Sequence, residues 1–276
     1  MKRIIRKVSA FAVLLSICVA GALNLTSCGY TRVSKQKSDL NLDDYRLVMY
    51  DEFEGNELNT YLWEYRSTGK RDGGFMHPEQ VSVENGKLVI TAEHRSSEYG
   101  EGWHAGEISL KQRYTYGYFE IRCMPNSSEE FRSACWLCSD NAYDHDISKG
   151  GVGGAEILVF STYGEKTISN KNCIFSNICC NGYDDNTKEF DLERVAKVRV
   201  PNLQTEYTTF GVMWTEDEYI FYVNGEETGR TSFGKGTSAV PEEFAFGMVI
   251  PDEITLDKRD ATKFVIDYVK VYQLRK

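Results

Sequence analysis

Short apolar runs with a period of two, separated by turn signals, constrain the fold of this chain more than any other feature. Alternate side chains in these runs are apolar, which is typical of β-strands with one buried face. The clearest runs are Lys87–His94, Tyr116–Met124, Tyr219–Asn224 and Lys263–Tyr272. The dipeptides Asn85-Gly86 and Asn224-Gly225 are typical of tight hairpin turns. Because no stretch keeps a helical period, the pattern predicts an all-β sandwich or barrel.

The N-terminus has the pattern of an export signal. Residues 1–27 carry basic residues at the start, no acidic residue, and an apolar run from Ala10 to Leu23. That run is too short to cross a bilayer as a helix. It is followed by Leu25-Thr26-Ser27-Cys28, which resembles a bacterial lipobox. The alternative is an ordinary secretory signal with an accidental cysteine. We expect lipidation at Cys28, so that the protein is exported and lipid-anchored at the cell envelope or cell surface.

Two segments follow the signal. Residues 28–43 are polar and predict a tether, whereas residues 44–276 are long enough for one large β-domain. The whole chain has 32 basic and 41 acidic residues, a net charge of −9. Without the four basic residues of the signal, 28 basic residues remain against 41 acidic ones, a net charge of −13. This balance argues against nucleic acid as a partner and is compatible with a neutral glycan.

Six cysteines remain in the predicted domain, and their spacing matches no small disulfide scaffold. They are Cys123, Cys135, Cys138, Cys173, Cys179 and Cys180. One interpretation is a zinc site formed by the C-x-x-C of Cys135 and Cys138 with Cys179-Cys180. However, this C-x-x-C lies in an apolar, strand-like run. Buried free thiols are therefore the interpretation that we favour.

Five motifs, in the same order along the chain, resemble those of glycoside hydrolase family 16. They are Asp51-Glu52-Phe53 with Trp63, Tyr116–Arg122 (YGYFEIR), Ser133–Leu137 (SACWL), Phe210–Thr215 (FGVMWT) with Tyr222–Gly225, and Ile266–Tyr272 (IDYVKVY). The match covers the predicted domain from about residue 44 to residue 273. The resemblance implies a β-sandwich jelly roll of two antiparallel sheets, of the concanavalin A type. Its concave cleft would bind a β-linked glucan or galactan.

The resemblance places candidate ligand-binding residues on one strand. Tyr118, Glu120 and Arg122 share a face of the strand because side chains alternate. An aromatic ring, an acceptor and a guanidinium suit sugar hydroxyls, so the position in the family implies that this face lines the cleft. The alternative is that Glu120 and Arg122 pair on a solvated face.

Tryptophans are further candidates. Trp136 matches a cleft tryptophan of related hydrolases, and Trp103 lies in a glycine-rich stretch, so both are candidate sugar platforms. For each of them a place in the core is the alternative, because tryptophan on a strand is more often buried. We assign Trp63 and Trp214 to the core.

The catalytic strand departs from the family pattern. Family members have E-[IL]-D-x-x-E, in which a bulge brings the last glutamate to the face of the first. Here Glu156 stands at the position of the nucleophile, whereas Leu158 replaces the aspartate and Ser161 replaces the acid/base glutamate. In the strand of relatives that reads I-H-[WY]-D-G-Y, this chain has Cys179 in place of the histidine, followed by Asn181 as a candidate substrate contact. These departures predict weak or lost hydrolysis.

The resemblance also implies a structural calcium ion, for which Asp267 matches the aspartate and Gly86 a backbone ligand. No cofactor is otherwise required. We therefore expect a monomeric surface lipoprotein that binds a β-linked polysaccharide and cuts it poorly or not at all. One alternative is an active retaining endo-β-glucanase with a relocated acid, for example Asp144, Asp146, Glu165, Asp184 or Asp185. Another is a jelly roll used for adhesion or protein contact.

Overall fold

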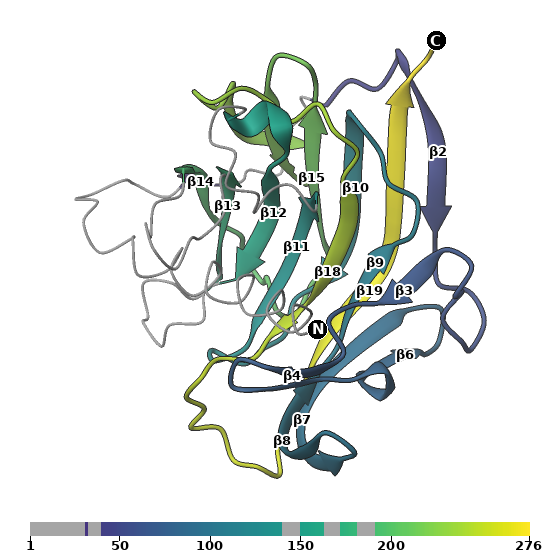
Figure 1. Cartoon of the computed structure of the whole chain (residues 1–276), viewed down its shortest axis with the longest axis vertical. Helices are drawn as coiled ribbons and strands as arrows, with labels where there is room; N and C mark the ends of the chain where they lie inside the picture. Colours follow the sequence, from purple (N-terminus) through teal and green to yellow (C-terminus); the bar gives the residue numbers. More distant parts are fainter. Residues whose placement is uncertain (1–30, 33–39, 140–149, 163–171, 181–190) are drawn as a thin grey trace, which may run out of the picture.

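The chain folds into two facing β-sheets with almost no helix (Figure 1). The computed structural model describes residues 31–32, 40–139, 150–162, 172–180 and 191–276. The strands are β1 Thr31–Arg32, β2 Tyr45–Asp51, β3 Trp63–Tyr65, β4 Gly69–Arg71, β5 Gly74–Met76, β6 Val81–Val83, β7 Leu88–Ser97, β8 Gly100–Ala105, β9 Glu107–Leu110, β10 Gly117–Met124, β11 Arg132–Cys138, β12 Glu156–Thr162, β13 Cys173–Cys180, β14 Asp191–Arg199, β15 Thr208–Trp214, β16 Tyr219–Val223, β17 Glu226–Thr231, β18 Glu243–Val249 and β19 Ala261–Leu274. Two short 3₁₀ helices, η2 Pro78–Gln80 and η4 Gly150–Gly153, complete the described elements.

The topology is that of a jelly roll, in which strands distant in the sequence are neighbours. The eight-stranded sheet has the order β1-β14-β13-β12-β11-β18-β9-β3. The eleven-stranded sheet has the order β17-β16-β15-β10-β19-β7-β8-β5-β4, with β2 paired to β19 and β6 to β7. The pairs β1–β14 and β5–β8 are parallel, and the other pairs named here are antiparallel. The predicted all-β jelly roll of two sheets is therefore confirmed.

The main core fills the space between the two sheets. In β10, Phe119 and Ile121 belong to this core, so the predicted alternation along the strand is confirmed. Trp63 and Trp214 are fully buried in the same core, as predicted. Each indole nitrogen donates a hydrogen bond, from Trp63 to Asp51 Oδ2 (2.8 Å) and from Trp214 to the carbonyl oxygen of Ser238 (2.9 Å). These bonds offset the cost of burying a polar indole group.

Both predicted hairpin turns are present. Asn85 and Gly86 have φ of 53° and 69° between β6 and β7, and Asn224 and Gly225 have φ of 52° and 78° between β16 and β17. Two consecutive residues with positive φ form the turn that matches the twist of a two-residue hairpin. Asparagine and glycine tolerate this conformation better than other residues, which explains why the dipeptides marked the turns correctly.

Parts of the predicted tether contact the β-domain. Within the predicted tether, Thr31–Arg32 form β1 and pair with the edge strand β14. Leu40 and Leu42 contact a small cluster of Tyr118, Met213 and Tyr222 on the eleven-stranded sheet. The predicted signal peptide and Cys28 lie outside the described residues. Within the described ranges, no helix has the length and apolar character needed to span a membrane.

In the described structure, the six cysteines of the domain are buried thiols that form no disulfide bond. Cys135 belongs to the main core, whereas Cys138 belongs to a second apolar cluster on the other side of the same sheet. Residues three apart on a strand point to opposite faces, so this C-x-x-C cannot close around one ion. In the parts of the chain that the structure describes, no group of three or more potential ligands is placed to hold a metal. The predicted buried thiols are confirmed.

Candidate functional site

The candidate site lies on the outer face of the eight-stranded sheet, which we define as the face turned away from the main core. In β12, Ile157 and Val159 belong to the core between the sheets. Leu158 instead belongs to a second apolar cluster, and Glu156 shares its side of the strand because side chains alternate. This second cluster consists of Ala134, Trp136, Cys138, Leu158, Cys173, Phe175, Ala245 and Val249.

A bulge in β12 brings position 161 to the same outer face. The register shifts between Leu158, which is opposite Asn177, and Ser161, which is opposite Phe175. Residues directly opposite each other in a sheet point to the same side. Phe175 belongs to the outer cluster, so Ser161 shares a face with Glu156 despite its odd spacing. The bulge that the family pattern implied is therefore present.

The three motif positions consequently lie on one face, but two of them carry side chains other than the carboxylic acids of the family pattern. Glu156 is the only carboxylic acid in β12 and is 2 % exposed. Leu158 fills the position between it and Ser161 with an apolar side chain. The Ser161 hydroxyl donates a hydrogen bond to the carbonyl oxygen of Thr162 (3.1 Å). A retaining glycosidase needs two carboxyl groups about 5–5.5 Å apart, and this strand supplies one.

Two thiols flank Glu156 on the neighbouring strands. Glu156 is opposite Cys138 of β11 on one side and opposite Cys179 of β13 on the other. The structure thus places Cys179 beside Glu156 in the sheet. Asn181, the other candidate from this segment, lies outside the described residues, as do the five acidic residues considered as relocated acids.

Asn177 is a polar residue of this face that the sequence reasoning missed. Its side chain is 2 % exposed. Among the described residues, neither its amide nitrogen nor its amide oxygen has a hydrogen-bond partner. A buried amide without partners costs free energy, which makes it a candidate for binding a ligand. The period-two pattern could have identified it, because Asn177 lies two residues before Cys179.

Trp136 lies on this outer face and is covered. It is opposite Leu158 and only 1 % exposed. The Arg66 guanidinium lies over its indole ring, 5.6 Å from the centroid. Arg66 in turn contacts Glu107 (2.5 Å) and Glu243 (2.8 Å). Trp136 is therefore neither an open platform nor part of the core between the sheets.

The comparison with known proteins assigns the family. The family model described as the GH16 domain of β-porphyranases A–D matches residues 47–274, which is most of the chain. The protein belongs to glycoside hydrolase family 16. A β-glucanase from Rhodothermus marinus is 24 % identical over 205 residues, which are 71 % of this chain and 68 % of the β-glucanase.

Solved structures of the family share the fold. SCLam, a non-specific endo-β-1,3(4)-glucanase of family 16, has a TM-score of 0.69 at 19 % identity, covering 87 % of this chain and 95 % of its own. Porphyranase B from Zobellia galactanivorans also has a TM-score of 0.69 at 19 % identity, covering 90 % and 100 %. This family 16 domain is therefore a glycan-acting protein related to glucanases and porphyranases.

Two of the residues expected in the cleft lie on the other sheet of the family 16 domain. Glu120 and Arg122 belong to β10, on the face opposite to the core residues Phe119 and Ile121. The eleven-stranded sheet turns this face away from the eight-stranded sheet, so Glu120 and Arg122 cannot share a cleft with Trp136. Glu120 accepts a hydrogen bond from the Tyr118 hydroxyl (2.9 Å). The predicted cleft position of Glu120 and Arg122 is therefore wrong.

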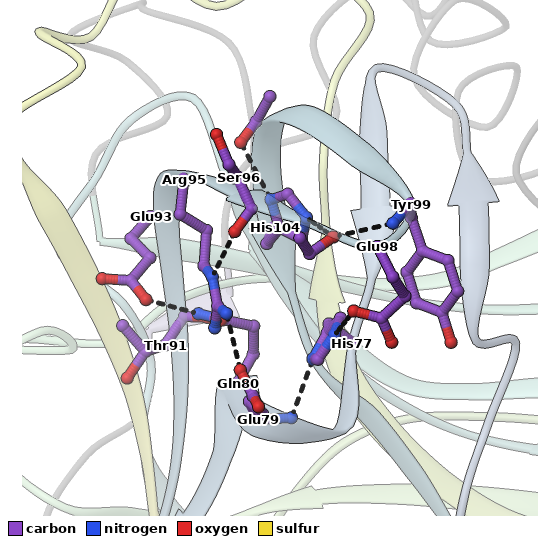
Figure 2. Close-up of polar contacts among 12 residues, drawn as sticks. His77, Glu79, Gln80, Thr91, Glu93, Arg95, Ser96, Glu98, Tyr99 and His104 are labelled. Carbon is purple, nitrogen blue, oxygen red and sulfur yellow. Dashed lines mark hydrogen bonds and ion pairs between the residues drawn. The ribbon is translucent and has the colours of Figure 1, made fainter.

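Trp103 lies in the core and is not the sugar platform that was predicted. It belongs to the main core and contacts Phe131 edge to face, with 5.2 Å between the ring centroids. Figure 2 shows polar contacts of the hairpin β7–β8 that carries it. His104 donates from Nδ1 to the carbonyl oxygen of Gly102 (2.9 Å) and accepts at Nε2 from the Ser97 hydroxyl (2.7 Å). Burial lowers the pKa of His104, which keeps the ring in this neutral form.

A buried carboxyl group close to Glu156 is a further feature that the sequence reasoning missed. Glu242 precedes β18 and is fully buried. Its Oε1 accepts a hydrogen bond from the backbone nitrogen of Ala155 (3.2 Å), the residue before Glu156. Burial, together with the neighbouring charge of Glu156, raises the pKa of Glu242 to about 8. The side chains of two consecutive residues on a strand point to opposite faces. The pair Glu242-Glu243 at the start of a strand could therefore have been used to predict that one of the two carboxyl groups points into the protein.

Proposed function

We propose that this family 16 protein binds a β-linked polysaccharide on the outer face of its eight-stranded sheet and hydrolyses it slowly or not at all. One observation carries the proposal. The bulge in β12 brings Ser161 to the face of Glu156, at the position where the family has its acid, and a serine hydroxyl stands there. β12 thus keeps the bulged geometry of a catalytic strand but carries no carboxyl group at the position of the proton donor.

The groups on this face suit a sugar ligand. Glu156 supplies an acceptor for hydroxyl groups, and Asn177 supplies both a donor and an acceptor. Trp136 supplies an aromatic surface once the Arg66 guanidinium moves from it. The related proteins include a β-glucanase and a porphyranase, so β-glucans and porphyran are the first polysaccharides to test.

Glu242 does not replace the missing acid. Its carboxyl group remains protonated near neutral pH, as a general acid must, but it points to the wrong face of the sheet. Glu243 is opposite Cys138 of the outer cluster, so the adjacent Glu242 points to the inner face, opposite to that of Glu156 and Ser161. A general acid has to come within hydrogen-bonding distance of the oxygen that it protonates. Without a positioned acid, the loss in rate is about 10²- to 10⁴-fold, or roughly 3–5 kcal/mol of activation free energy.

The experiment is a glycan-binding screen on the purified protein, followed by a reducing-sugar assay on each polysaccharide that binds. We expect binding with almost no release of reducing ends. Turnover at about 1 s⁻¹ or faster, which is within the ordinary range of enzymes, would show instead an active glucanase. Absence of both binding and turnover would favour a role in adhesion or protein contact.

Asn177→Leu should separate binding from stability. Replacing a buried amide without partners by an apolar side chain of similar size should raise the free energy of unfolding by about 1 kcal/mol. The same change should weaken glycan binding by about tenfold or more, because it removes a hydrogen-bonding group of the site. Calorimetric titration and urea unfolding measure the two effects.

Asn126→Leu is the matched control, because Asn126 is equally buried but donates to the carbonyl oxygen of Phe131 and to Ser133. It should destabilise the protein without a specific effect on binding. Unchanged glycan affinity in Asn177→Leu would contradict a role of Asn177 in the site.

We also propose that Cys28 anchors the protein to a membrane, on the basis of the lipobox-like sequence before it. Cys28→Ala should move the protein from the membrane fraction to the soluble fraction and remove the acyl mass from the mature N-terminus. Fractionation with mass spectrometry tests this. A wild-type protein without acyl mass would refute lipidation, and the sequence would then be an ordinary secretory signal.

A further inference from the structure

The turn between β6 and β7 lies against β19, on the eleven-stranded sheet and away from the candidate site. The family resemblance implied a calcium ion held here by Asp267 and by the backbone of Gly86. The structure does bring these groups together, but around a lysine. The Lys87 ammonium donates to the carbonyl oxygen of Gly86 (2.9 Å) and contacts Asp267 Oδ1 (2.8 Å). Both oxygens expected to hold the ion are thus bound to one side chain.

The second oxygen of Asp267 also has a cationic partner. Arg122 forms an ion pair with Asp267 Oδ2, and its guanidinium lies over the ring of Tyr207 at 4.9 Å. Partial burial raises the pKa of Asp267, but hydrogen bonds from Lys87 and Arg122 lower it further. The pKa of Asp267 therefore lies below its usual value. Asp267 therefore stays ionised and is shared between two positive side chains.

These residues do not fit a calcium ion. Calcium takes six to eight oxygen ligands, whereas the contacts of Asp267 are two cationic side chains. A divalent cation placed here would be repelled by the ammonium and by the guanidinium, and it could reach the two oxygens only by displacing the lysine. The three groups carry one negative charge and two positive charges, so the carboxylate is already neutralised before any ion arrives.

We propose that the Lys87 ammonium stands where relatives of this protein would bind calcium, and that it makes the fold independent of the ion. Lys87 ties the β6–β7 turn to β19 through the two contacts that a bound cation would make. Because the lysine is part of the chain, it links the turn to β19 without calcium from the surroundings. This role does not depend on the proposed glycan-binding function.

Thermal unfolding of the full protein in EDTA, in excess calcium and in excess magnesium tests the proposal. The Tm of the wild type should be the same in all three conditions. Lys87→Met keeps the apolar stem and removes the charge, so its Tm in EDTA should fall by about 2–4 °C. Calcium, but not magnesium, should recover part of this loss. Removing the ammonium frees Asp267 Oδ1 and the carbonyl oxygen of Gly86 and leaves Asp267 with one cationic partner, so a calcium ion can bind there with water as its other ligands.

Lys263→Met is the matched control. Lys263 pairs with Glu84 at 3.7 Å on the exposed surface of the same region. Exposed ion pairs contribute little to the free energy of unfolding, so this variant should be nearly as stable as the wild type. Its Tm should match the wild type in every condition. The proposal is overturned if calcium raises the Tm of the wild type, if Lys87→Met behaves like Lys263→Met in EDTA, or if calcium leaves the Tm of Lys87→Met unchanged.

Discussion

Replacing Leu158 by aspartate and Ser161 by glutamate in the same chain should raise the hydrolysis of laminarin or mixed-linkage glucan by about 100-fold or more over the wild type. The bulge already directs position 161 to the face of Glu156, so the introduced glutamate would supply the missing acid on the correct side. The introduced aspartate would lie beside Asn177, whose amide can donate a hydrogen bond to it.

Each single change should recover less. Ser161→Glu alone leaves the apolar side chain of Leu158 between the two carboxyl groups, so neither is oriented and neither has its pKa adjusted. The gain should therefore be non-additive, as is usual for residues that act as a unit. Product release measured by chromatography gives the rates. Glu156→Gln in the double variant is the control and should abolish the recovered activity.

Circular dichroism and binding measurements must accompany the rates, because both substitutions place polar groups among buried apolar neighbours. A folded double variant that binds glycan but is no faster than either single variant would show that the missing carboxyl groups are not the reason for the low activity. A wild type that already turns over its polysaccharide at about 1 s⁻¹ would contradict the starting assumption.

Glu242→Gln should change the pH dependence of stability by several kcal/mol. The folded protein keeps Glu242 protonated up to about pH 8, whereas a glutamate in the unfolded chain ionises near pH 4.5. Between these values the unfolded state binds fewer protons than the folded state. The free energy of unfolding of the wild type therefore receives a contribution that falls as pH rises from about 4.5 to about 8. Glutamine has no proton to lose, so the variant lacks this decline.

Urea unfolding of both proteins at pH 5 and pH 8 measures the effect. The free energy of unfolding of the variant should be close to that of the wild type at pH 5 and higher than that of the wild type at pH 8. Each unit of difference between the pKa values of Glu242 in the folded and unfolded chains contributes about 1.4 kcal/mol to this gap. Glu253→Gln, at an exposed glutamate, should follow the wild type at both values. Glu156→Gln should move the transition of Glu242 to lower pH by removing a neighbouring negative charge. Identical pH dependence in Glu242→Gln and the wild type would show that Glu242 is ionised in the folded chain.

Local patterns in the sequence were sufficient to predict the all-β class and several of its strands and turns. Period-two alternation identified the four clearest strands, and Asn85-Gly86 and Asn224-Gly225 identified two of the turns. Both signals depend on neighbouring residues only, since alternation follows from the strand itself and the turns from the backbone freedom of asparagine and glycine. The ordered family motifs added the jelly-roll topology, which requires pairing of distant strands.

The assignment of faces needed the tertiary structure. Alternation showed correctly that Glu120 and Arg122 share a face, but a strand looks the same whichever of its faces meets a ligand. Only the pairing of β10 within the eleven-stranded sheet shows that this face points away from Trp136. Local alternation alone would have placed Ser161 on the face opposite to Glu156. The family pattern implied the bulge that shifts the alternation by one residue, and the register with β11 and β13 shows it.

Contacts between residues far apart in the chain decided the rest. The sequence by itself determined that Glu156 is the only carboxylic acid of its strand, because Leu158 and Ser161 stand at the two other motif positions. It did not determine that Glu242 lies beside Glu156, that Arg66 covers Trp136, or that Lys87 binds Asp267. Each of these pairs is brought together by strands that are distant in sequence, so no local pattern records them. The shifted pKa values of Glu242 and Asp267 likewise follow from burial and from neighbouring charges, which exist only in the folded protein.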